Sequence, residues 1–250
     1  MADQYFSAQP SSEDSRQVIE VDIQGIPTTV ETSHGVFSSH RLDLGTRVLL
    51  KEVPGRAADE AEGHRVKNCL DLGCGWGPIS LALAREYPQA TVWALDVNER
   101  AVELTKANAR RNHVASVQAG TAESLAADYG QAWEEARFDL IWSNPPIRVG
   151  KEELHALLST YLTRLAEGGY AYLVVQKNLG ADSLVPWLAQ HLDDHFSVRK
   201  KASAKGYRVI EVHRSSETNT PGMTAGESAN KAAGGPVADE RSEESAEAQA

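Results

Sequence analysis

The sequence predicts an α/β protein with a doubly wound, Rossmann-like parallel sheet. From residue 66 onward, short apolar runs alternate with segments whose apolar residues recur at helical spacing. Strands that alternate with helices in this way form a parallel sheet covered by helices on both faces. A glycine-rich segment also follows the first of these runs, where such folds turn from strand to helix. The chain has 250 residues, 41% of them apolar, which is enough to bury a core of this size.

The N-terminal residues 1–53 are expected to form a ribbon and a helix that pack on this core. Residues 18–23 and 26–30 are strand-like, and Gln24-Gly25 between them suits a turn, so a short antiparallel ribbon is expected. Residues 41–53 then have a helical pattern. Its candidate core positions are Leu42, Leu49 and Leu50.

Residues 66–214 are expected to form the Rossmann-like domain, after a surface loop over 54–65 that is rich in Gly, Ala and charged residues. Most of its expected strands are short apolar runs, and the run over 170–175 is apolar enough for a central strand. The expected strands cover residues 69–72, 91–95, 138–142, 170–175, 195–199 and 207–212. The expected helices cover 79–87, 99–111 with Asn98 as its cap, 154–165 ended by Gly168-Gly169, and the region around 184–188.

The C-terminal residues 215–250 are expected to be a disordered acidic tail. They are rich in Ser, Ala, Glu, Gly and Thr and contain no aromatic residue. Such a composition buries too little apolar surface to offset the entropy lost on ordering. Seven acidic and two basic residues give this tail half of the net charge of −10, so that charge does not exclude an anionic ligand elsewhere.

Several classes of protein are disfavoured by composition. No apolar stretch reaches the roughly 18 residues of a transmembrane helix, and the first residues lack the pattern of a secretory signal. Cys69 and Cys74 have no accompanying Cys/His cluster, so reduced thiols are expected, with a metal site as the alternative. We therefore expect a cytoplasmic protein without a membrane anchor or a bound metal.

The glycine-rich segment Asp71-Leu72-Gly73-Cys74-Gly75-Trp76-Gly77-Pro78 has the position of a cofactor loop. Its glycines let the backbone turn sharply and approach a ligand closely. Pro78 stands where a dinucleotide fingerprint would have glycine, and it removes an N–H group that a pyrophosphate could use. No Lys-Ser/Thr pair follows, as a P-loop would require. The pattern favours a cofactor without phosphates, and a tight turn without a ligand is the alternative.

Asp96 ends the second expected strand of the domain. A carboxylate at about this place accepts hydrogen bonds from ribose hydroxyls in nucleotide-binding folds. The alternative is that Asp96 provides negative charge at the start of the helix that begins at Glu99.

Ser143-Asn144-Pro145-Pro146-Ile147 follows directly on an expected strand. Two prolines can simply end a strand, but this sequence also suits methyl transfer to an amine. The amino group of a purine is a poor nucleophile, because its lone pair is delocalised into the ring. The side-chain carbonyl of Asn144 and the carbonyl of Pro145 can accept hydrogen bonds from such an amine and aim its lone pair at a methyl donor. The prolines hold the second acceptor rigidly, and Ile147 offers an apolar surface to the base.

These motifs together resemble the methyltransferase small domain family of class I S-adenosylmethionine-dependent methyltransferases, and within it the 16S ribosomal RNA guanine-N2 methyltransferases. The resemblance covers about residues 4–213. Its matching segments are Gln4-Tyr5-Phe6-Ser7, Gly35-Val36-Phe37-Ser38, Leu42-Asp43-Leu44-Gly45-Thr46, residues 71–78, Asp96-Val97-Asn98, Arg100-Ala101-Val102, Asn144-Pro145-Pro146-Ile147-Arg148 and Lys205-Gly206-Tyr207.

The resemblance implies a mostly parallel, seven-stranded sheet whose last strand is antiparallel, and S-adenosylmethionine as cofactor. The implied cofactor-binding residues are Asp71, Gly73, Cys74, Gly75, Trp76, Gly77, Asp96, Val97, Ala122, Glu123 and Asn144. The implied catalytic residues are Asn144, Pro145, Pro146 and Ile147. Phe37, Arg148, Lys151 and Lys205 are the expected contacts to substrate, which the resemblance implies to be ribosomal RNA or the small ribosomal subunit.

Basic residues near the site, with the cluster Arg199, Lys200, Lys201, Lys205 and Arg208, can form a rim for RNA or a solvated face.

Three other functions remain open at this point. Methylation of a protein glutamine or of adenine N6 begins with the same Asn-Pro-Pro motif, but those sites usually continue with an aromatic residue where this chain has Ile147. A non-catalytic RNA-binding module of the same fold is the third alternative, although Gly73, Gly75, Asp96 and Asn144 are all present.

Overall fold

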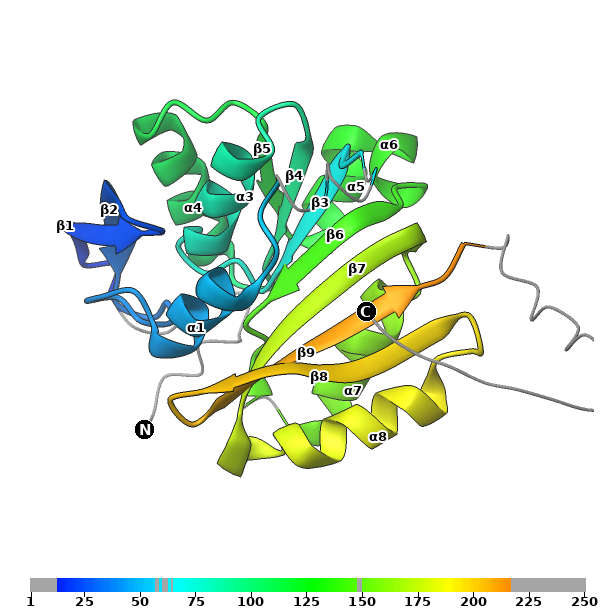
Figure 1. The fold of residues 1–250 in the computed structure, drawn as a ribbon. Helices are drawn as coiled ribbons and strands as arrows, with labels where there is room; N and C mark the ends of the chain where they lie inside the picture. The colour runs from blue at the N-terminus through cyan, green and yellow to red at the C-terminus, as the bar shows by residue number, and fades with distance from the viewer. Residues whose placement is uncertain (1–12, 57–58, 60–62, 64, 148–149, 217–250) are drawn as a thin grey trace, which may run out of the picture. The chain divides into compact units, whose positions relative to one another are not determined.

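Figure 1 shows the computed structural model, which describes residues 13–56, 59, 63, 65–147 and 150–216. All of these residues belong to the compact unit Met1–Thr218, and Asn219–Ala250 are a second unit. Of the acidic tail expected over 215–250, only Ser215 and Ser216 are therefore among the described residues.

The core of the first unit is a seven-stranded sheet with the strand order β5-β4-β3-β6-β7-β9-β8. Strands β3 to β7 pair in parallel, whereas β9 is antiparallel to both β7 and β8. This confirms the predicted mostly parallel sheet with an antiparallel last strand. The strands are β3 (Asn68–Leu72), β4 (Thr91–Leu95), β5 (Val117–Gly120), β6 (Phe138–Ser143), β7 (Leu165–Gln176), β8 (Phe196–Ala204) and β9 (Tyr207–Arg214).

Helices cover both faces of the sheet (Figure 1). Neighbouring residues of β3 show the two faces: Cys69 packs into one core cluster and Leu70 into the other, because successive side chains of a strand point to opposite sides. One cluster contains α1 (Leu44–Glu52), α3 (Pro78–Glu86) and α4 (Glu99–Arg111). The other contains α5 (Ala122–Tyr129), α6 (Gln131–Glu134), α7 (Lys151–Leu162) and α8 (Ala181–His191).

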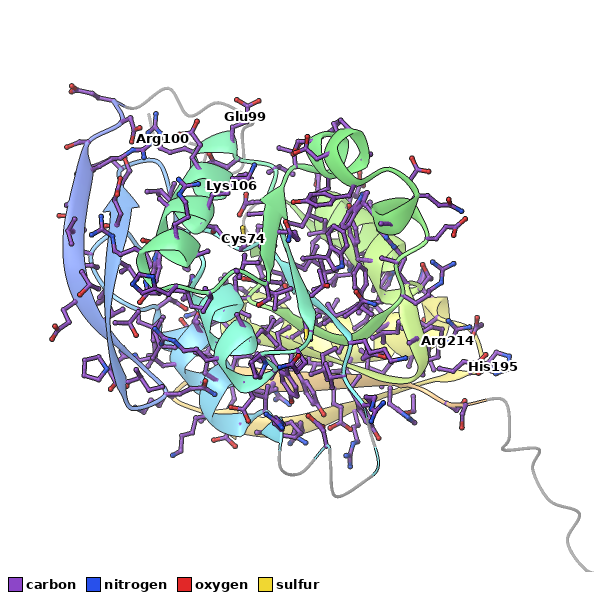
Figure 2. All side chains as sticks on the ribbon, turned by 90° about the horizontal axis from the view of Figure 1, so that it is seen from above. Cys74, Glu99, Arg100, Lys106, His195 and Arg214 are labelled. Atoms are coloured by element: carbon purple, nitrogen blue, oxygen red, sulfur yellow. The ribbon has the colours of Figure 1, made fainter. Side chains whose placement is uncertain are left out.

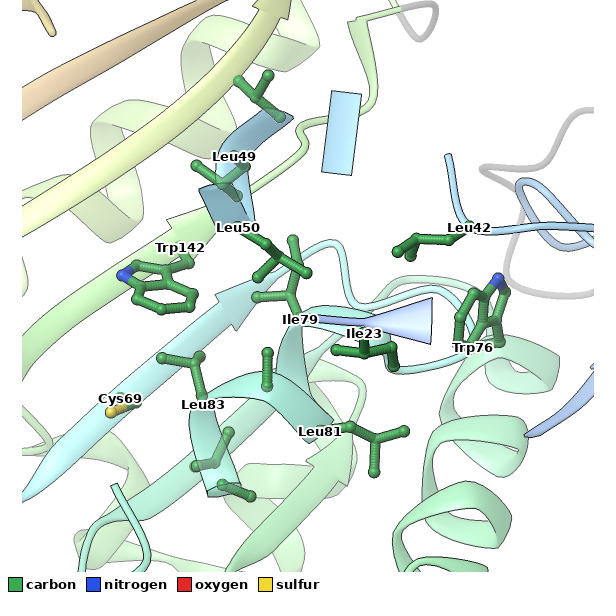
Figure 3. Packing of buried hydrophobic residues seen from close by; sticks show 14 of the residues in the cluster. Ile23, Leu42, Leu49, Leu50, Cys69, Trp76, Ile79, Leu81, Leu83 and Trp142 are labelled. Carbon is green, nitrogen blue, oxygen red and sulfur yellow. The ribbon is translucent and has the colours of Figure 1, made fainter. Parts of the chain in front are cut away.

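The first cluster joins the N-terminal segment to the sheet. Figure 3 shows Leu49 and Leu50 of α1 beside Trp142 of β6 and Ile79 of α3. Leu49 and Trp142 are fully buried. Truncating a fully buried leucine costs roughly 2–5 kcal/mol, so α1 is held mainly by this apolar contact.

The predicted ribbon consists of β1 (Arg16–Ile23) and β2 (Ile26–Ser33), which pair antiparallel through a turn at Gln24-Gly25. Both turn residues have positive φ, 54° and 81°, as the tight hairpin turn requires. The ribbon is fastened to α4 by the buried side chain of Asn108, whose Oδ1 accepts from the backbone N–H of Glu31. Its Nδ2 donates to the carbonyls of Glu31 and Trp76.

Three expectations about individual elements need correction. The helix expected over 41–53 begins at Leu44, because Asp43 caps it and accepts from the backbone N–H of Thr46. The helix expected to reach residue 165 ends at Leu162, and Gly168-Gly169 lie within β7. A Cβ atom on Gly169 would lie 2.9 Å from the carbonyl oxygen of Phe138, so this glycine allows close pairing of β7 with β6 and does not end a helix.

The segments between α1 and β3 and after β5 also differ from expectation. Asp59, in the stretch expected to be a surface loop, is buried and accepts a hydrogen bond from the hydroxyl of Tyr87. Helices α5 and α6 lie in a stretch to which no element was assigned. In the described part of the chain, no helix is long and apolar enough to cross a membrane.

Candidate active site

A cavity of about 830 Å³ lies at the carboxyl ends of β3, β4 and β6. This is the edge of a doubly wound sheet where ligands bind. The motifs singled out from the sequence meet here, although they are far apart along the chain. The predicted site residues that line the cavity are Phe37, Gly73, Cys74, Gly75, Trp76, Asp96, Val97, Ala122, Glu123, Asn144, Pro145, Pro146 and Ile147.

The glycine-rich loop turns between β3 and α3 along one wall of this cavity. The backbone N–H groups of Gly73 and Cys74 both donate to the carbonyl of Leu95, at 2.8 and 3.0 Å. Gly73, Gly75 and Gly77 have φ values of 83°, 57° and 91°, which side chains rarely adopt. No atom lies within 4 Å of where a Cβ on Gly75 would be, so the backbone there is open to a ligand.

Gly77 and Asp71 support this loop from beneath and do not line the cavity. Gly77 begins α3, and a Cβ there would lie 3.0 Å from Oγ1 of Thr105. Asp71 is fully buried and accepts a hydrogen bond of 2.5 Å from the hydroxyl of Ser80 in α3. Burial raises the pKa of the Asp71 carboxyl from 3.8 to about 7. Asp71 therefore joins β3 to α3 below the cavity, and its predicted contact with the cofactor stays a prediction.

Asp96 lines the cavity beside the open part of the loop. Its Oδ2 accepts from the N–H of Gly75, and its Oδ1 accepts from the N–H of Asn98, both at 2.9 Å. Burial raises the pKa of this carboxyl, while these backbone hydrogen bonds act to lower it. Each carboxylate oxygen can accept more than one hydrogen bond, so both remain able to bind ligand hydroxyls.

The residues that line the cavity fit S-adenosylmethionine. Asp96 supplies acceptors for ribose hydroxyls, and the turn at Gly75 leaves room for a ligand beside the backbone. Val97, which is 51% exposed, and Ala122 give apolar surface next to Asp96. Asp96 also accepts the N–H of Asn98 just before α4, which agrees with the alternative role at the start of this helix, and its contact with ribose hydroxyls stays a prediction.

Asn144 stands at the end of β6, next to the glycine-rich loop. A Cβ on Gly73 would lie 3.7 Å from Cδ of Pro146 and 3.9 Å from the backbone oxygen of Asn144. The side-chain Nδ2 of Asn144 donates to Oδ2 of Asp43 at 2.9 Å and to Oγ1 of Thr46 at 3.1 Å. No described residue donates to its Oδ1. The carbonyl of Pro145 accepts from the N–H of Ile147 at 2.8 Å and keeps one lone pair for a ligand.

A further wall is formed by the segment Gly35–Ser38 between β2 and α1. Its ends are held by two side chains that also line the cavity. Nδ2 of Asn98 donates to the carbonyl of Gly35 at 2.9 Å, and the indole N–H of Trp76 donates to the carbonyl of Ser38 at 3.2 Å. Between them Phe37 lines the cavity with 45% of its surface exposed. Phe37 is therefore part of the cavity wall and not of the buried core.

Of the predicted basic contacts, Lys151 and Lys205 lie outside the lining of the cavity. Lys151 is exposed at the start of α7, and Lys205 is exposed at the turn between β8 and β9. Arg148 is outside the described residues. Three members of the predicted basic cluster are engaged in ion pairs: Arg199 and Lys201 with Glu211, and Arg208 with Asp182.

Sequence reasoning missed the roles of Asp43, Thr46 and Tyr207, which also line the cavity. Asp43 and Thr46 belong to a quoted motif, but their contact with Asn144 spans about a hundred positions and leaves no local pattern. Among the described residues, no group of three or more His, Cys, Asp or Glu side chains could hold a metal ion.

Comparison with known proteins identifies the family. The family model described as the methyltransferase small domain matches residues 27–211, which is most of the chain. The chain belongs to the methyltransferase small domain family. The family is S-adenosylmethionine-dependent, which agrees with the cofactor expected from the sequence and with the donor set around Asp96.

Two relatives and one solved structure illustrate the range of this family. The chain is 34% identical over 215 residues to the uncharacterized protein YbxB of Bacillus subtilis (strain 168), covering 86% of this chain and all of that one. It is 30% identical over 211 residues to the ribosomal RNA small subunit methyltransferase C of Ectopseudomonas mendocina (strain ymp), covering 83% of this chain and 57% of the relative.

The solved structure is the T. thermophilus 16S rRNA N2 G1207 methyltransferase in complex with AdoMet and guanosine. It superimposes with a TM-score of 0.64 at 28% identity, over 80% of this chain and 50% of that chain. The chain therefore spans about half the length of the methyltransferases of this family that it matches.

Proposed function

We propose that this chain transfers a methyl group from S-adenosylmethionine to the exocyclic N2 amine of a guanine in ribosomal RNA. The observation that carries the proposal is the side-chain amide of Asn144, whose nitrogen is bound by Asp43 and Thr46 at the edge of the cofactor cavity. Its oxygen is thereby available to a hydrogen-bond donor of the substrate. An exocyclic amine is such a donor.

The cofactor-binding part of the cavity is assigned to the glycine-rich loop, Asp96, Val97 and Ala122. Asp96 would accept hydrogen bonds from the two ribose hydroxyls, and the backbone around Gly75 would adjoin the methionine part. When bound, S-adenosylmethionine supplies an electrophilic methyl group on a sulfonium and leaves as a neutral thioether.

In this proposal Asn144 and Pro145 orient the amine. Oδ1 of Asn144 and the carbonyl of Pro145 each accept one of its N–H groups, which turns the nitrogen lone pair away from the ring. These hydrogen bonds strengthen as the nitrogen becomes positive, so they stabilise the transition state more than the bound substrate. No strong base is required at the start, because the amine loses its proton during or after transfer.

The base-binding part of the cavity is assigned to the apolar and aromatic residues around Asn144. Phe37, Ile147 and Tyr207 line the cavity there, and their surfaces suit the flat face of a base. A base inside structured RNA must be flipped out to reach Asn144. The guanosine bound by the T. thermophilus relative and the aliphatic Ile147 favour guanine over adenine or a protein side chain.

The test is methyl transfer with tritiated cofactor. Free 16S and 23S ribosomal RNA and intact small subunits, all from a strain lacking the gene, are incubated with the protein, and labelled nucleosides are then separated. We expect label in N2-methylguanosine. Label in N6-methyladenosine or in a ribosomal protein would instead support one of the two alternative methyltransferase activities.

Cofactor binding is tested separately by calorimetry. The intact protein is expected to bind S-adenosylmethionine in a one-to-one complex. Asp96→Ala should weaken this binding by about 1.5–3 kcal/mol for each charged hydrogen bond lost. A parent protein that binds no cofactor would contradict the assignment of the cavity, whatever the RNA assay shows.

A further inference from the structure

Helix α1 supplies two side chains that bind the amide of Asn144. Oδ2 of Asp43, the capping residue of this helix, lies 2.9 Å from Nδ2 of Asn144. Oγ1 of Thr46, in the first turn, lies 3.1 Å from the same nitrogen. Thr46 is 3% exposed, so its hydroxyl is largely shielded from water. Both hydrogens of the amide nitrogen therefore have partners within the protein.

The chemistry of these partners fixes which way the amide faces. A carboxylate can only accept hydrogen bonds, so the NH₂ group of Asn144, and not its oxygen, must lie against Asp43. The nitrogen and oxygen of an asparagine amide are on opposite sides of the group. Oδ1 is therefore held on the side away from α1.

We propose that Asp43 and Thr46 are positioning residues for methyl transfer, which act by holding the amide of Asn144 in the one orientation that presents Oδ1 to the substrate amine. This inference rests on the proposed function of Asn144. It gives the N-terminal segment a part in the reaction, in addition to packing on the sheet. A rotating amide would present its NH₂ group to the amine half of the time and repel it.

The contact with the carboxylate also strengthens the acceptor. When an amide N–H donates to a negative charge, electron density shifts toward the amide oxygen, because hydrogen bonds in a chain polarise one another. Oδ1 of Asn144 then accepts more strongly from an amine that is becoming positive. Asp43 stays in place throughout, since its Oδ2 also accepts from the backbone N–H of Thr46 at 3.1 Å.

Gly45 explains why this arrangement needs the whole motif Asp43-Leu44-Gly45-Thr46. A Cβ on Gly45 would lie 2.9 Å from Oδ2 of Asp43 and 2.8 Å from Cε1 of Tyr207. Any side chain there would push the carboxylate away from Asn144 or the tyrosine ring into the cavity. The glycine thus lets Tyr207, from the other end of the domain, close the wall beside Asp43.

The kinetic test compares Asp43→Ala with Asp43→Asn, and Thr46→Val with Thr46→Ser. The alanine and valine variants remove a partner of Nδ2. The asparagine and serine variants keep an oxygen in the same place. We expect the first variant of each pair to lower the single-turnover rate on free 16S ribosomal RNA about 10- to 100-fold, the range for residues that orient a site ligand. Thr46→Ser should restore most of the rate, and Asp43→Asn should restore part of it, because it keeps an acceptor and loses the negative charge. Cofactor affinity should stay within about twofold in all four.

A control variant separates positioning from loss of the helix cap. Leu49→Val weakens α1 from its buried side, away from Asn144. It should lower the melting temperature at least as much as Asp43→Ala and keep the parent rate. If Asp43→Ala transfers at the parent rate, or if Asp43→Asn is as slow as Asp43→Ala, the positioning role is wrong.

A second measurement needs no substrate. In a protein with isotope-labelled asparagine, the amide signal of Asn144 is identified by its loss in Asn144→Asp. Its exchange with water should be at least about tenfold slower in the parent than in Asp43→Ala. Equal exchange in the two would overturn the inference. If the parent modifies no RNA, the proposed function fails, and this measurement still decides whether Asp43 holds the amide.

Discussion

In the amide of Asn144, one polar atom is bound by the protein and the other can bind a ligand. Its nitrogen is bound by groups of the protein, and no described residue donates to its oxygen. Asp96 is similar, since each of its oxygens accepts one backbone N–H and can accept another hydrogen bond from a ligand. The geometry of both side chains is therefore set before any ligand arrives, which is the condition for efficient transition-state stabilisation.

Asn144→Ala should abolish most methyl transfer and leave cofactor affinity largely intact. One preorganised hydrogen-bonding group typically contributes about 10²–10³ to the rate, and this one acts mainly in the transition state. Single-turnover rate, cofactor affinity and melting temperature are measured on the same variant. A proportional fall of all three would mean that Asn144 serves folding, and an unchanged rate would refute its catalytic role. Asn144→Asp keeps an acceptor and should retain part of the activity.

Asp71 should make the protein less stable as the pH rises through the mildly acidic range. Its pKa is raised from 3.8 to about 7 in the folded state, so the folded chain binds this proton more tightly than the unfolded chain. The advantage is present at low pH and is lost between about pH 4 and about pH 7, by roughly 4 kcal/mol in total. The test is to measure the unfolding free energies of the parent and of Asp71→Asn across this range. The parent should lose stability relative to Asp71→Asn as the pH rises.

The exposed residue Asp128 provides the control for this measurement. Asp128→Asn removes one carboxylate of the same type from the surface of α5, so it changes net charge without changing a buried group. Its unfolding free energy should follow that of the parent at every pH. A flat difference between the parent and Asp71→Asn would show that the Asp71 carboxyl has an ordinary pKa.

Among the elements, the segment between β2 and α1 is held by side chains that donate to its backbone carbonyls. Figure 2 shows Arg100 of α4 pointing toward the ribbon, where it donates to the carbonyl of His34 at 2.7 Å. Trp76 and Asn98 hold the next residues of this segment, Gly35–Ser38, through backbone carbonyls. The cofactor loop and the wall that carries Phe37 are thus coupled by the indole N–H of Trp76.

Trp76→Phe should weaken RNA binding, and it should also lower the melting temperature, because it leaves a void at a fully buried side chain. The variant leaves the carbonyl of Ser38 without this donor, which costs about 1 kcal/mol, or about a fivefold change in the KM for RNA. Trp93→Phe is the matched control, because it also removes an indole hydrogen bond, to Asn68, but outside the cavity. Equal KM values in the two variants would show that the segment does not depend on Trp76.

The elements that were predicted correctly carry strong local signals. Residues 91–95 form β4 and residues 99–111 form α4 with Asn98 as its cap, because a dense apolar run and a capping side chain are both visible in the sequence. Gly168-Gly169 were misread, since glycine ends helices and also permits close approach of strands. Only the register of β7 beside Phe138 distinguishes the two uses.

At the scale of the whole molecule, the topology brings together cavity-lining residues that are as far apart in the sequence as residues 36 and 207. The carboxyl ends of parallel strands meet at one edge, so the meeting of the glycine-rich loop, Asp96 and Asn144 could be predicted from the order of the strands. The positions of Asp43 and Tyr207 could not. They depend on how α1 packs against the sheet and on where the β8–β9 hairpin lies in it. No local sequence pattern predicts that packing.

Residues 217–250 should be dispensable for catalysis, because their composition cannot support a core. The truncation is best placed after Ser216, since Ser215 donates to the carbonyl of His195 from both its backbone N–H and its hydroxyl. Figure 2 shows His195 close to Arg214 at this end of the sheet. The shortened protein should keep the parent melting temperature and turnover. A large loss of either would mean that the removed residues belong to the folded enzyme.

The two cysteines offer a built-in measure of how the molecule opens. Cys69 lies fully buried between α3 and Trp142 (Figure 3), and Cys74 lies in the cavity wall, where Thr105 donates to its sulfur. Burial raises the pKa of both thiols well above the usual value, so neither reacts with an alkylating reagent while its surroundings are closed. Labelling at Cys74 would then report local opening of the glycine-rich loop, which a bound cofactor suppresses. Labelling at Cys69 would report unfolding of the sheet itself. One alkylating reagent can therefore measure the rates of both local opening and unfolding in the unaltered chain.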